Sequence, residues 1–453
     1  MLTATEAAAR LGVKLGTLYA YVSRGWLKSY KRKVGRQTLY RRADIEALRG
    51  VTMPERGRRA RSLPDASSWV TIAQPRAEGP PSGVIVAESA VSSIIDGQLA
   101  YRGFPIEELV RSATFEEVCW LLWSGEPADA VQAAALRQRM SGAELPGPVV
   151  AALAAVRRDA PPLLRLAIMM PALAACAPAM AIDRAAFGQI DQASAIIGLM
   201  PQVIAGGADR GTTGDSRRLA DGIAGRLLRL TLREADRDDR VVLDQVLVAC
   251  AEHELNASTF AARVVASTGA DLYASVLAAL CSLSGPIHGG ACDRIERMFG
   301  ELAGGAKLGA MLAEFADKQL LPPGFGHAIY RDGDPRAALL KRVAAEMARR
   351  RGRRIFETAR KIEEAVARRQ GLRPNLDFYL TVCVRMLGLP PGSPAAVFAL
   401  GRAAGWIAHS LEQYADNRLI RPRMRYRGSP LRHWRGSAAA NGSTARKLDE
   451  TPS

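Results

Sequence analysis

The sequence carries few histidines, and four of the five fall between residues 253 and 409. One of them, His288, lies in the segment SGPIHGGA, where glycines on both sides let a ligand approach the backbone closely. We expect a helix to begin just after it, and the N-terminal end of a helix disfavours a protonated imidazole. We therefore interpret His288 as a neutral ring that donates a hydrogen bond to an oxyanion developing in a reaction.

A second histidine, His327, lies in LPPGFGHAIYRDGDPRA (321–337), and Arg331 and Arg336 follow it within nine residues. The Pro-Pro-Gly-Phe-Gly segment before His327 predicts a loop that exposes main-chain groups. Guanidinium groups beside such a loop suit a phosphorylated or carboxylated ligand, because each can form two parallel hydrogen bonds with it.

An isolated carboxylate, Asp377, follows in RPNLDFYLTVCVRMLGLP (373–390), an otherwise apolar helical run. Apolar surroundings raise the pKa of a carboxyl group and make it a usable base near neutral pH. Arg402 lies inside a later apolar helix, and Arg421 lies on the loop after that helix. Two histidines, this aspartate and the arginines together suit proton abstraction next to a carbonyl in a carboxylate-binding pocket.

The segment AEHELNASTFAARVV (251–265) places His253 and Asn256 three residues apart, so on a helix they share one face. Alone, such a pair is more typical of interior polar residues than of a ligand site. No group of His, Cys and Asp residues has the spacing of a metal-ligand set, and we expect no metal.

Helical patterning dominates the elements that must hold these side chains. The segment 104–125 predicts two helices. In the second, Thr114 is the expected N-cap, Glu117 completes a capping box, and Gly125 ends the helix.

Other segments of the body give weaker signals. Strand patterns are limited to the short pieces GVIVAES (83–89) and QLAYRG (98–103). The longest apolar run, residues 166–182, contains two prolines and predicts a core helix or helix pair rather than a membrane span. The sequence therefore predicts an all-α body with one small β element near its start and no contact with a membrane.

Charge is unevenly distributed along the 453 residues, which carry a formal net charge of +17. Residues 1–62 hold 15 Lys and Arg against 4 Asp and Glu, so most of the excess lies there. This asymmetry indicates a nucleic-acid-binding module on a nearly neutral body, with a solvated basic extension as the alternative. Six cysteines without a C-x-x-C pair, and an N-terminus without a signal-peptide pattern, predict a cytoplasmic protein.

The first 50 residues have the pattern of a small helical domain. Thr5 is the expected cap of a short helix with Leu11 facing inward, and a second helix over about 15–24 presents Leu18 and Val22 to the core. A basic, hairpin-like segment follows. The pattern resembles the MerR-like and excisionase-like winged helix-turn-helix domains.

In domains of that kind the second helix enters the major groove of DNA and the basic wing contacts phosphate. The candidate DNA-binding residues on the helix are Lys14, Thr17, Tyr19, Tyr21 and Arg24. Those on the wing are Lys31, Arg32, Lys33 and Arg36. The alternative is a helical appendage that binds another protein.

The body resembles the citrate synthase family over about residues 84–430. The segments that carry the resemblance are SGPIHGGA, PPGFGHAIYRDGDPRA, RPNLDFY and DNRLIRPR. It implies an all-α fold in which a large and a small domain close over the active site of an obligate homodimer. The expected parts are a winged helix-turn-helix domain at 1–62, a linker at 63–83, a large domain at 84–283 and 388–436, a small domain at 284–387 and a disordered tail at 437–453.

The resemblance also implies a catalytic triad of His288, His327 and Asp377. Asp377 would take a proton from the methyl group of acetyl-CoA while His288 hydrogen-bonds the thioester oxygen. The resulting enol or enolate would attack the ketone of oxaloacetate, with His327 donating to the oxygen that becomes the citrate hydroxyl. Hydrolysis of citryl-CoA would complete the reaction, with acetyl-CoA as co-substrate and no cofactor.

Further positions match the residues that hold the two substrates in that family. The implied oxaloacetate set is His253, Asn256, Arg336, Arg402 and Arg421, the last reaching across from the other subunit. The implied CoA set is Pro323, Gly324, Phe325, Gly326 and Arg331.

Two stretches depart from the family pattern. After HGGA the bacterial family usually continues Asn-Glu, whereas this chain has Cys292-Asp293, and residues from about 159 to 240 follow the family only loosely. The resemblance implies citrate synthase activity, an acyltransferase reaction of the tricarboxylic acid cycle. One alternative is a 2-methylcitrate synthase that uses propionyl-CoA, because one methylene changes binding by only ~1–3 kcal/mol. Another is a DNA-binding regulator whose synthase-like body senses a metabolite.

Overall fold

The computed structural model describes most of the chain. The described residues are 1–11, 15, 18–19, 22, 29–31, 38–42, 45, 87–157, 159–176, 186–206, 221–232, 236–330, 332–422 and 426–429. The chain divides into two compact units, Met1–Val70 and Thr71–Ser453.

The first unit contains an antiparallel sheet of order β1-β3-β2. Its elements are β1 (Leu2–Thr3), α1 (Ala4–Leu11), β2 (Ser29–Lys31) and β3 (Thr38–Tyr40). The buried residues are Ala7, Ala8, Leu18, Tyr40 and Ile45, with Leu11 and Val22 packed against them. The inward positions predicted for Leu11, Leu18 and Val22 are therefore confirmed.

The cap of α1 is Thr3, and the prediction of Thr5 is wrong. The Thr3 hydroxyl accepts from the main-chain N–H of Glu6 (3.3 Å), and Glu6 Oε2 accepts from the Thr3 N–H (2.8 Å). This capping box needs a hydroxyl residue three positions before the glutamate, a spacing that Thr3 has and Thr5 lacks. The helix therefore begins at Ala4, with Thr5 in its first turn.

The second unit begins with a small antiparallel sheet. Its strands are β4 (Ser92–Ile95), β5 (Gln98–Tyr101) and β6 (Phe104–Pro105). Asp96 and Gly97 join β4 to β5 with φ of 50° and 76°, the signs that a type I′ hairpin turn requires. The β element expected near the start of the body is confirmed. In GVIVAES, however, residues 87–89 form no strand, and 83–86 lie outside the described residues.

Helices make up most of the remaining described residues, so the all-α prediction for the body is confirmed. They are α4 (Ile106–Ser112), α5 (Phe115–Ser124), α6 (Ala130–Ser141), α7 (Gly147–Ala154), α8 (Pro162–Cys176), α9 (Ala186–Ile204), α11 (Gly222–Thr231), α12 (Arg237–Cys250), α13 (Ala257–Ser267), α14 (Leu272–Leu283), α15 (Gly290–Ala303), α16 (Leu308–Asp317), α17 (Pro335–Arg351), α18 (Arg354–Gln370), α19 (Leu376–Leu387) and α20 (Ser393–Asp416).

Helices α4 and α5 are the two helices expected in 104–125. The Thr114 hydroxyl accepts from the Glu117 N–H (3.4 Å), and Glu117 accepts from the Thr114 N–H (2.7 Å), which is the predicted capping box. Gly125 ends α5 in the left-handed conformation (φ 91°). Local sequence alone therefore determines both ends of α5.

The apolar run 166–182 begins inside α8, which buries Leu166, Met169 and Leu173. The described part of the run is thus a core helix, as predicted, and 177–182 lie outside the described residues. Within the described part of the chain, no helix is both long and apolar enough to cross a membrane.

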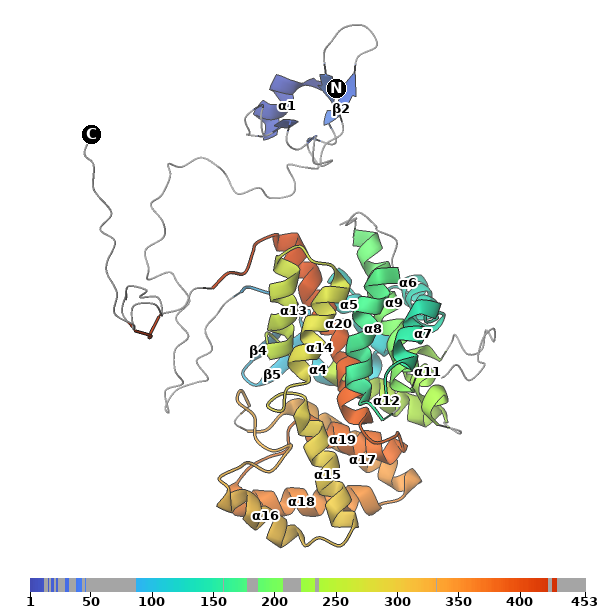
Figure 1. Cartoon of the computed structure of the whole chain (residues 1–453), viewed down its shortest axis with the longest axis vertical. Coiled ribbons are helices and arrows are strands. Elements are labelled where there is room, and N and C mark those ends of the chain that lie inside the picture. The colour runs from blue at the N-terminus through green and yellow to red at the C-terminus, as the bar shows by residue number, and fades with distance from the viewer. Residues whose placement is uncertain are drawn as a thin grey trace, which may run out of the picture. The chain divides into compact units, whose positions relative to one another are not determined.

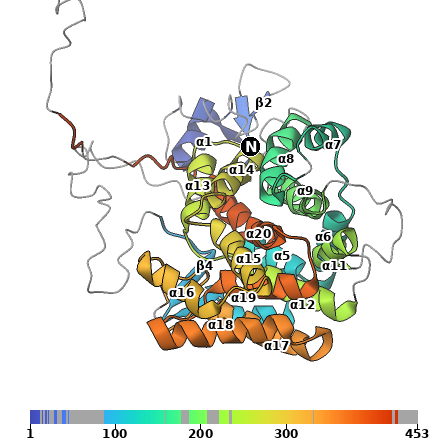
Figure 2. The ribbon, with the colours of Figure 1, turned by 60° about the horizontal axis from the view of Figure 1, so that its bottom comes forward.

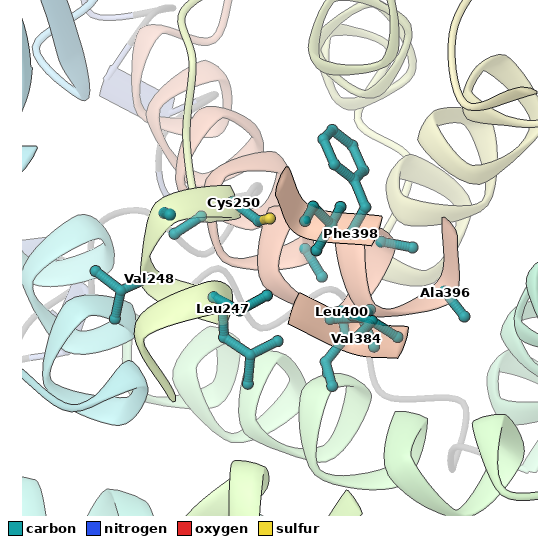
Figure 3. Packing of buried hydrophobic residues seen from close by; sticks show 14 of the residues in the cluster. Leu247, Val248, Cys250, Val384, Ala396, Phe398 and Leu400 are labelled. Atoms are coloured by element: carbon teal, nitrogen blue, oxygen red, sulfur yellow. The ribbon is translucent and has the colours of Figure 1, made fainter. Parts of the chain in front are cut away.

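Two groups of helices can be distinguished in the second unit (Figure 1). Helices α15 to α19 gather in the lower part of Figure 1 and are called the lower lobe. The sheet β4–β6, helices α4 to α14 and helix α20 are called the upper lobe. Apolar side chains of α12, α19 and α20 pack together between the lobes (Figure 3). Among them Leu247, Cys250, Val384 and Leu400 are fully buried or nearly so. The domain boundaries expected from the family remain a prediction.

Helix α20 is buried from Ser393 to Ser410. A helix enclosed on all sides is normally apolar on all sides, because a buried charge is costly unless it is paired or used. Arg402 and His409 are the titratable residues inside this stretch. Because Arg402 and His409 are both buried, we expect each side chain to be paired with another group or to bind a ligand.

Candidate active site

His288 lies in the turn between α14 and α15, directly before Gly289, the N-cap of α15. The helix start predicted after His288 is therefore confirmed. The Gly289 N–H donates to the Leu283 carbonyl (2.9 Å), and a Cβ atom on Gly289 would collide with that carbonyl. The glycine thus closes a tight turn that no larger residue fits.

The ring of His288 is half-buried, and its Nε2 lies 2.9 Å from the Ser258 hydroxyl. That hydroxyl donates its proton to Oδ1 of Asn256 (2.8 Å) and accepts a hydrogen bond from Nε1 of Trp406 (3.1 Å). Burial, with a smaller contribution from the Arg402 guanidinium, lowers the pKa of His288 to about 4. The ring is therefore neutral at pH 7, as predicted.

Asp377 lies in the first turn of α19, whose N-cap Asn375 accepts from the Asp377 N–H (3.1 Å). Burial raises the pKa of the Asp377 carboxyl, against the opposing effect of the Arg336 guanidinium. The prediction of a raised pKa is confirmed. Such a carboxylate is a stronger base near neutral pH than an exposed aspartate.

His288 and Asp377 line the same small cavity, of about 10 Å³, which matches about one water molecule. Its other lining residues are Leu283, Gly289, Cys292, Ala395 and Phe398. Cys292 Sγ lies 3.8 Å from Oδ1 of Asp377, and burial raises the pKa of this thiol well above its usual range. The thiol therefore stays protonated and faces the carboxylate as a weak hydrogen-bond donor.

His327 belongs to a second cluster, with His253 and Tyr330. Its ring centre lies 5.2 Å from that of His253 and 4.7 Å from that of Tyr330, whose hydroxyl is 3.0 Å from His253 Nε2. Nδ1 of His327 accepts from the Ile329 N–H (3.1 Å), so a neutral ring carries its proton on Nε2. Burial, and to a smaller extent Arg336, lower the pKa of His327 to about 4. His327 therefore presents one N–H donor at pH 7.

Arg336 stands at the start of α17 and forms a bidentate ion pair with Asp334. Its Nε donates to Oδ1 (3.0 Å) and its Nη2 to Oδ2 (2.8 Å). Asp334 is also the N-cap of α17 and accepts from the Leu376 N–H (3.0 Å). One buried carboxylate thus joins the starts of α17 and α19 and orients the arginine.

Arg402 is only 1% exposed, in the middle of α20. Its Nε donates to the Cys250 carbonyl (2.6 Å), and its guanidinium carbon lies 4.7 Å from the centre of the Phe398 ring. Burial is the largest cause that holds the pKa of His253 well below its usual range, and Arg336 and Arg402 add to it. The space around His253 is therefore positive, which suits an anionic ligand.

A buried polar network lies behind His253. The Glu252 carboxylate accepts from the Ser92 hydroxyl (3.0 Å) and lies 3.1 Å from Nε2 of His409. Nδ1 of His409 in turn lies 3.0 Å from Nη1 of Arg263. Because Arg263 can only donate, the proton of a neutral His409 ring points to Glu252. This chain of contacts holds the main chain next to His253.

The loop before His327 does not expose its main chain, so that prediction is wrong. In this loop Pro322, Pro323, Gly324 and Phe325 are buried, and Gly326 is half-buried. The Gly326 N–H donates to the Arg373 carbonyl, and the Gly324 carbonyl accepts from the Asn375 N–H, both at 2.9 Å. The loop pairs with this segment because its glycines adopt φ of 85° and 79°, which other residues rarely do.

His253 and Asn256 do not lie on a helix, contrary to the prediction from their spacing. Both precede α13, and Asn256 is its N-cap, with Oδ1 accepting from the Thr259 N–H (3.0 Å). An asparagine side chain that bonds the first turn in this way marks the start of a helix rather than its interior. Asn256 reaches His288 only indirectly, through Ser258.

The remaining predicted positions are described only in part. Arg421 is exposed after the end of α20, as its predicted loop position requires. Arg331 lies outside the described residues. Among the candidate DNA-binding residues, Tyr19 is 52% exposed and Lys31 lies in β2. Those outside the described residues are Lys14, Thr17, Tyr21, Arg24, Arg32, Lys33 and Arg36.

Sequence reasoning missed three side chains of this site: Ser258, Tyr330 and Asp334. Asp334 had a local signal, because an aspartate followed by proline is a frequent helix start. Ser258 and Tyr330 had none. They meet His288 and His253 across 30 and 77 residues of sequence, through tertiary contacts alone.

Comparison with known proteins decides the family. Residues 80–423 match the family model described as citrate synthase, C-terminal domain. The chain belongs to the citrate synthase family. It is therefore an acyltransferase, as predicted. Residues 1–49 match the model of a helix-turn-helix domain, which confirms the second resemblance.

Relatives within the citrate synthase family carry two enzyme names. Citrate synthase of Haloferax volcanii is 36% identical over 363 residues, 76% of this chain and 94% of that protein. 2-Methylcitrate synthase 2 of Corynebacterium glutamicum is 30% identical over 370 residues, 77% of this chain and 94% of that protein. Family membership therefore leaves the choice of acyl-CoA open.

Solved citrate synthases share the fold. The enzyme of Thermoplasma acidophilum, in a ternary complex with carboxymethyl coenzyme A and oxaloacetate, has a TM-score of 0.69 at 25% identity, over 78% of this chain and 97% of that one. The enzyme of Thermotoga maritima has a TM-score of 0.68 at 28% identity, over 80% of this chain and 98% of that one.

Proposed function

We propose that this citrate synthase family member condenses acetyl-CoA with oxaloacetate and water to give citrate and CoA. The observation that carries the proposal is that His288, in the turn before α15, and Asp377, in the first turn of α19, line one water-sized cavity. Removing a proton from the carbon beside a thioester needs a base of raised pKa and a donor for the oxygen that gains charge. The two residues meet both needs.

Enolisation is the first step of the proposed reaction. The Asp377 carboxylate removes a proton from the acetyl methyl group. In this structure the single proton of the Ser258 hydroxyl goes to Oδ1 of Asn256, so a neutral His288 ring donates from Nε2 to Ser258. In the proposed reaction Ser258 turns its proton to Nε2 of His288, and the ring then donates from Nδ1 to the thioester oxygen. A neutral donor in an apolar cavity stabilises the enolate oxygen without adding a charge that must be desolvated.

Condensation follows on the oxaloacetate side. The enolate carbon attacks the ketone carbon, and His327 donates from Nε2 to the ketone oxygen as it becomes a hydroxyl. Arg402 and Arg336 bind the two carboxylates beside His253. The pairing of Arg336 with Asp334 uses Nε and Nη2, and within the described part of the chain Nη1 has no hydrogen-bond partner. Water then cleaves citryl-CoA and releases CoA.

The site also needs motion and a second subunit in this proposal. An acetyl group does not fit a space of about 10 Å³, so the lobes must part to admit the thioester. In this proposal, residues 323–326 and Arg331 bind CoA. The exposed Arg421 completes the oxaloacetate site of the partner subunit in a homodimer. No cofactor or metal takes part, and a cytoplasmic location remains a prediction.

Release of free thiol tests the proposal directly. Purified protein is given oxaloacetate with either acetyl-CoA or propionyl-CoA, and kcat/KM is measured for each. Higher kcat/KM with acetyl-CoA supports citrate synthase, and higher kcat/KM with propionyl-CoA moves the protein to 2-methylcitrate synthase. Release from neither, by folded and dimeric protein, refutes both and favours the metabolite-sensing regulator.

DNA binding is a second function, favoured by the match of residues 1–49 to a helix-turn-helix domain and by the excess of 15 basic over 4 acidic residues in 1–62. A homodimer would present two such modules to two half-sites. Binding of the full chain to random-sequence duplex DNA should weaken steeply with salt. A variant with Lys31, Arg32 and Lys33 changed to Gln should lose most of this affinity. Equal affinity of the two proteins would indicate that these residues do not contact DNA.

A further inference from the structure

Two charged pairs join α12 of the upper lobe to α17 of the lower lobe. Arg351 donates from Nε to Oδ1 of Asp239 (2.6 Å) and from Nη2 to Oδ2, and Arg350 donates from Nη1 to Oδ2 of Asp238 (2.6 Å). We call Asp238, Asp239, Arg350 and Arg351 the clasp. Within the described ranges, the ion pairs that connect the two lobes all involve these two arginines.

The clasp and the candidate active site lie at opposite ends of the same two helices. Helix α12 starts at the clasp and ends at Cys250, whose carbonyl binds Arg402 and which is followed by His253. Helix α17 starts with Arg336 and ends at the clasp. Figures 1 and 2 both show α12 beside α17. At 1.5 Å per residue, the clasp stands about 22 Å from Arg336 along α17.

Asp239 is the most constrained member of the clasp. It is fully buried, and its carboxylate also accepts from the Asp236 N–H (3.2 Å) in the capping box of α12. A buried carboxylate bound in a bidentate manner by arginine permits one relative placement of the two groups. The pair of Asp239 and Arg351 therefore sets the position of α17 along α12. The exposed pair of Asp238 and Arg350 adds little by itself.

The candidate site is divided between the lobes. His253 and Arg402 belong to the upper lobe, whereas His327, Arg336 and Asp377 belong to the lower lobe. In the site itself, the hydrogen bonds between the lobes use histidines, His253 to Tyr330 and His288 to Ser258. These contacts must change when a ligand enters.

Outside the site, polar contact between the lobes rests on few groups. The described residues offer the clasp and the hydrogen bond from the Gly392 N–H to Glu296 (2.8 Å). Of these two contacts, only the clasp involves α17, the helix that carries Arg336. A ligand that enters the site does not need to displace the clasp. It can stay closed while the site opens.

We propose that Asp239 and Arg351 are positioning residues that anchor the far end of α17 to α12. The lower lobe then pivots at the clasp and returns Arg336 to the same place beside His253 each time the site closes. This inference rests on the proposed function, in which Arg336 and His253 bind oxaloacetate. It adds a pair of residues, remote from the substrates, on which oxaloacetate binding depends.

Substitution of Arg351 in the full chain tests the proposal. We expect Arg351→Gln to raise the KM for oxaloacetate about tenfold, because small misplacements of a binding group are costly, and to leave the KM for the acyl-CoA within about twofold. Arg351→Lys should recover part of the loss. The matched control is Arg349→Gln, which removes the same charge from an exposed neighbour at the same helix end and should leave both constants within about twofold of wild type.

An unchanged KM for oxaloacetate in folded Arg351→Gln would overturn the proposal, and so would an equal rise in both KM values. If this variant does not fold, the double variant Asp239→Asn and Arg351→Gln removes both charges together and should show the same selective rise. A normal KM for oxaloacetate in the double variant would also overturn the proposal.

The proposed function and the clasp can fail separately. If the wild-type protein releases no thiol, the proposed function fails and hydrogen exchange on the full chain decides the role of the clasp. Main-chain amides of 336–340 should then exchange faster in Arg351→Gln than in Arg349→Gln. Equal exchange in the two variants would refute the anchoring role as well.

Discussion

Titration of the candidate catalytic side chains is governed by how deeply each is enclosed. Burial raises the pKa of Asp377 and lowers those of His288 and His327, so the carboxylate becomes a better base while both rings stay neutral. The pKa of the carboxyl group and those of the two imidazoles thus shift in opposite directions. Enzymes use such opposite shifts to assign proton donors and acceptors at one pH.

Replacing the proposed base tests this assignment. Asp377→Asn keeps the shape of the side chain but cannot accept the methyl proton. We expect it to stay folded and to lose thiol release by about 10³-fold or more. Circular dichroism serves as the folding control. Turnover within tenfold of wild type would show that another group is the base.

Stability should depend on pH through the same histidines. Their native pKa of about 4 lies below the ~6.5 of an unfolded chain, so between these values the unfolded chain binds more protons. The contribution of these two histidines to the free energy of unfolding therefore falls as the pH is lowered from about 6.5 to 4. His327→Gln removes one of these groups and should flatten the dependence. Thermal melts at half-unit pH steps measure it, and equal slopes for both proteins would contradict the prediction.

Among the helices, α20 does most to bring distant segments together. It supplies Arg402 and His409, and its glycines let α12 and the segment after it approach closely. The Gly405 N–H donates to the Ala251 carbonyl (3.0 Å), and a Cβ atom on Gly405 would collide with Glu252. The polar network behind His253 thus depends on the absence of a Cβ atom at Gly405 in the neighbouring helix α20.

Alanine at Gly405 should therefore be harmful although α20 is a helix. We expect Gly405→Ala to lower the free energy of unfolding by ~1–3 kcal/mol through overpacking. The control is Gly300→Ala in α15, where a Cβ atom meets nothing within 4 Å, so alanine should raise stability by ~0.5–1 kcal/mol. Urea denaturation gives both values. A Gly405→Ala variant as stable as wild type would show that Glu252 and its neighbours can shift to accommodate the added methyl group without loss of stability.

At the scale of the whole molecule, the family membership and the exposed Arg421 lead to the proposed dimer. Each site would combine Asp377 of one subunit with Arg421 of the other. Mixing two defective proteins distinguishes this arrangement from sites built within one chain.

A mixed dimer of Asp377→Asn and Arg421→Ala subunits should contain one fully intact site. We expect the mixture, after exchange of subunits, to release thiol much faster than either parent alone. If Arg421 serves its own chain, each site of the mixed dimer carries one defect and no activity returns. Co-expression with two affinity tags provides the pure mixed dimer.

The two compact units of the chain should also be separable in function. A chain that begins after Ser62 should retain the kcat and KM of the full protein and lose the affinity for DNA. Both are measured on the same preparations, with salt held constant. Loss of turnover on truncation would mean that the first unit is part of the catalytic assembly.

Local patterns determined much of this protein from the sequence alone. A hydroxyl residue three positions before glutamate defines the start of α5, a glycine defines its end, and the Gly-Gly pair after His288 sets the start of α15. Such features depend on neighbours within one or two helical turns, so the sequence carries them directly. The motifs around His288, His327 and Asp377 likewise identified the family.

Other features were decided only by the tertiary structure. The glycine-rich loop before His327 was predicted to be exposed, but it pairs with residues 373–375. The spacing of His253 and Asn256 suggested that both lie on one helix, whereas Asn256 is the N-cap of α13. Ser258 and Tyr330 touch the histidines across long stretches of sequence, and the clasp joins residues 112 positions apart. Such contacts depend on how helices pack, and packing is set by the shape of the whole core rather than by any local pattern.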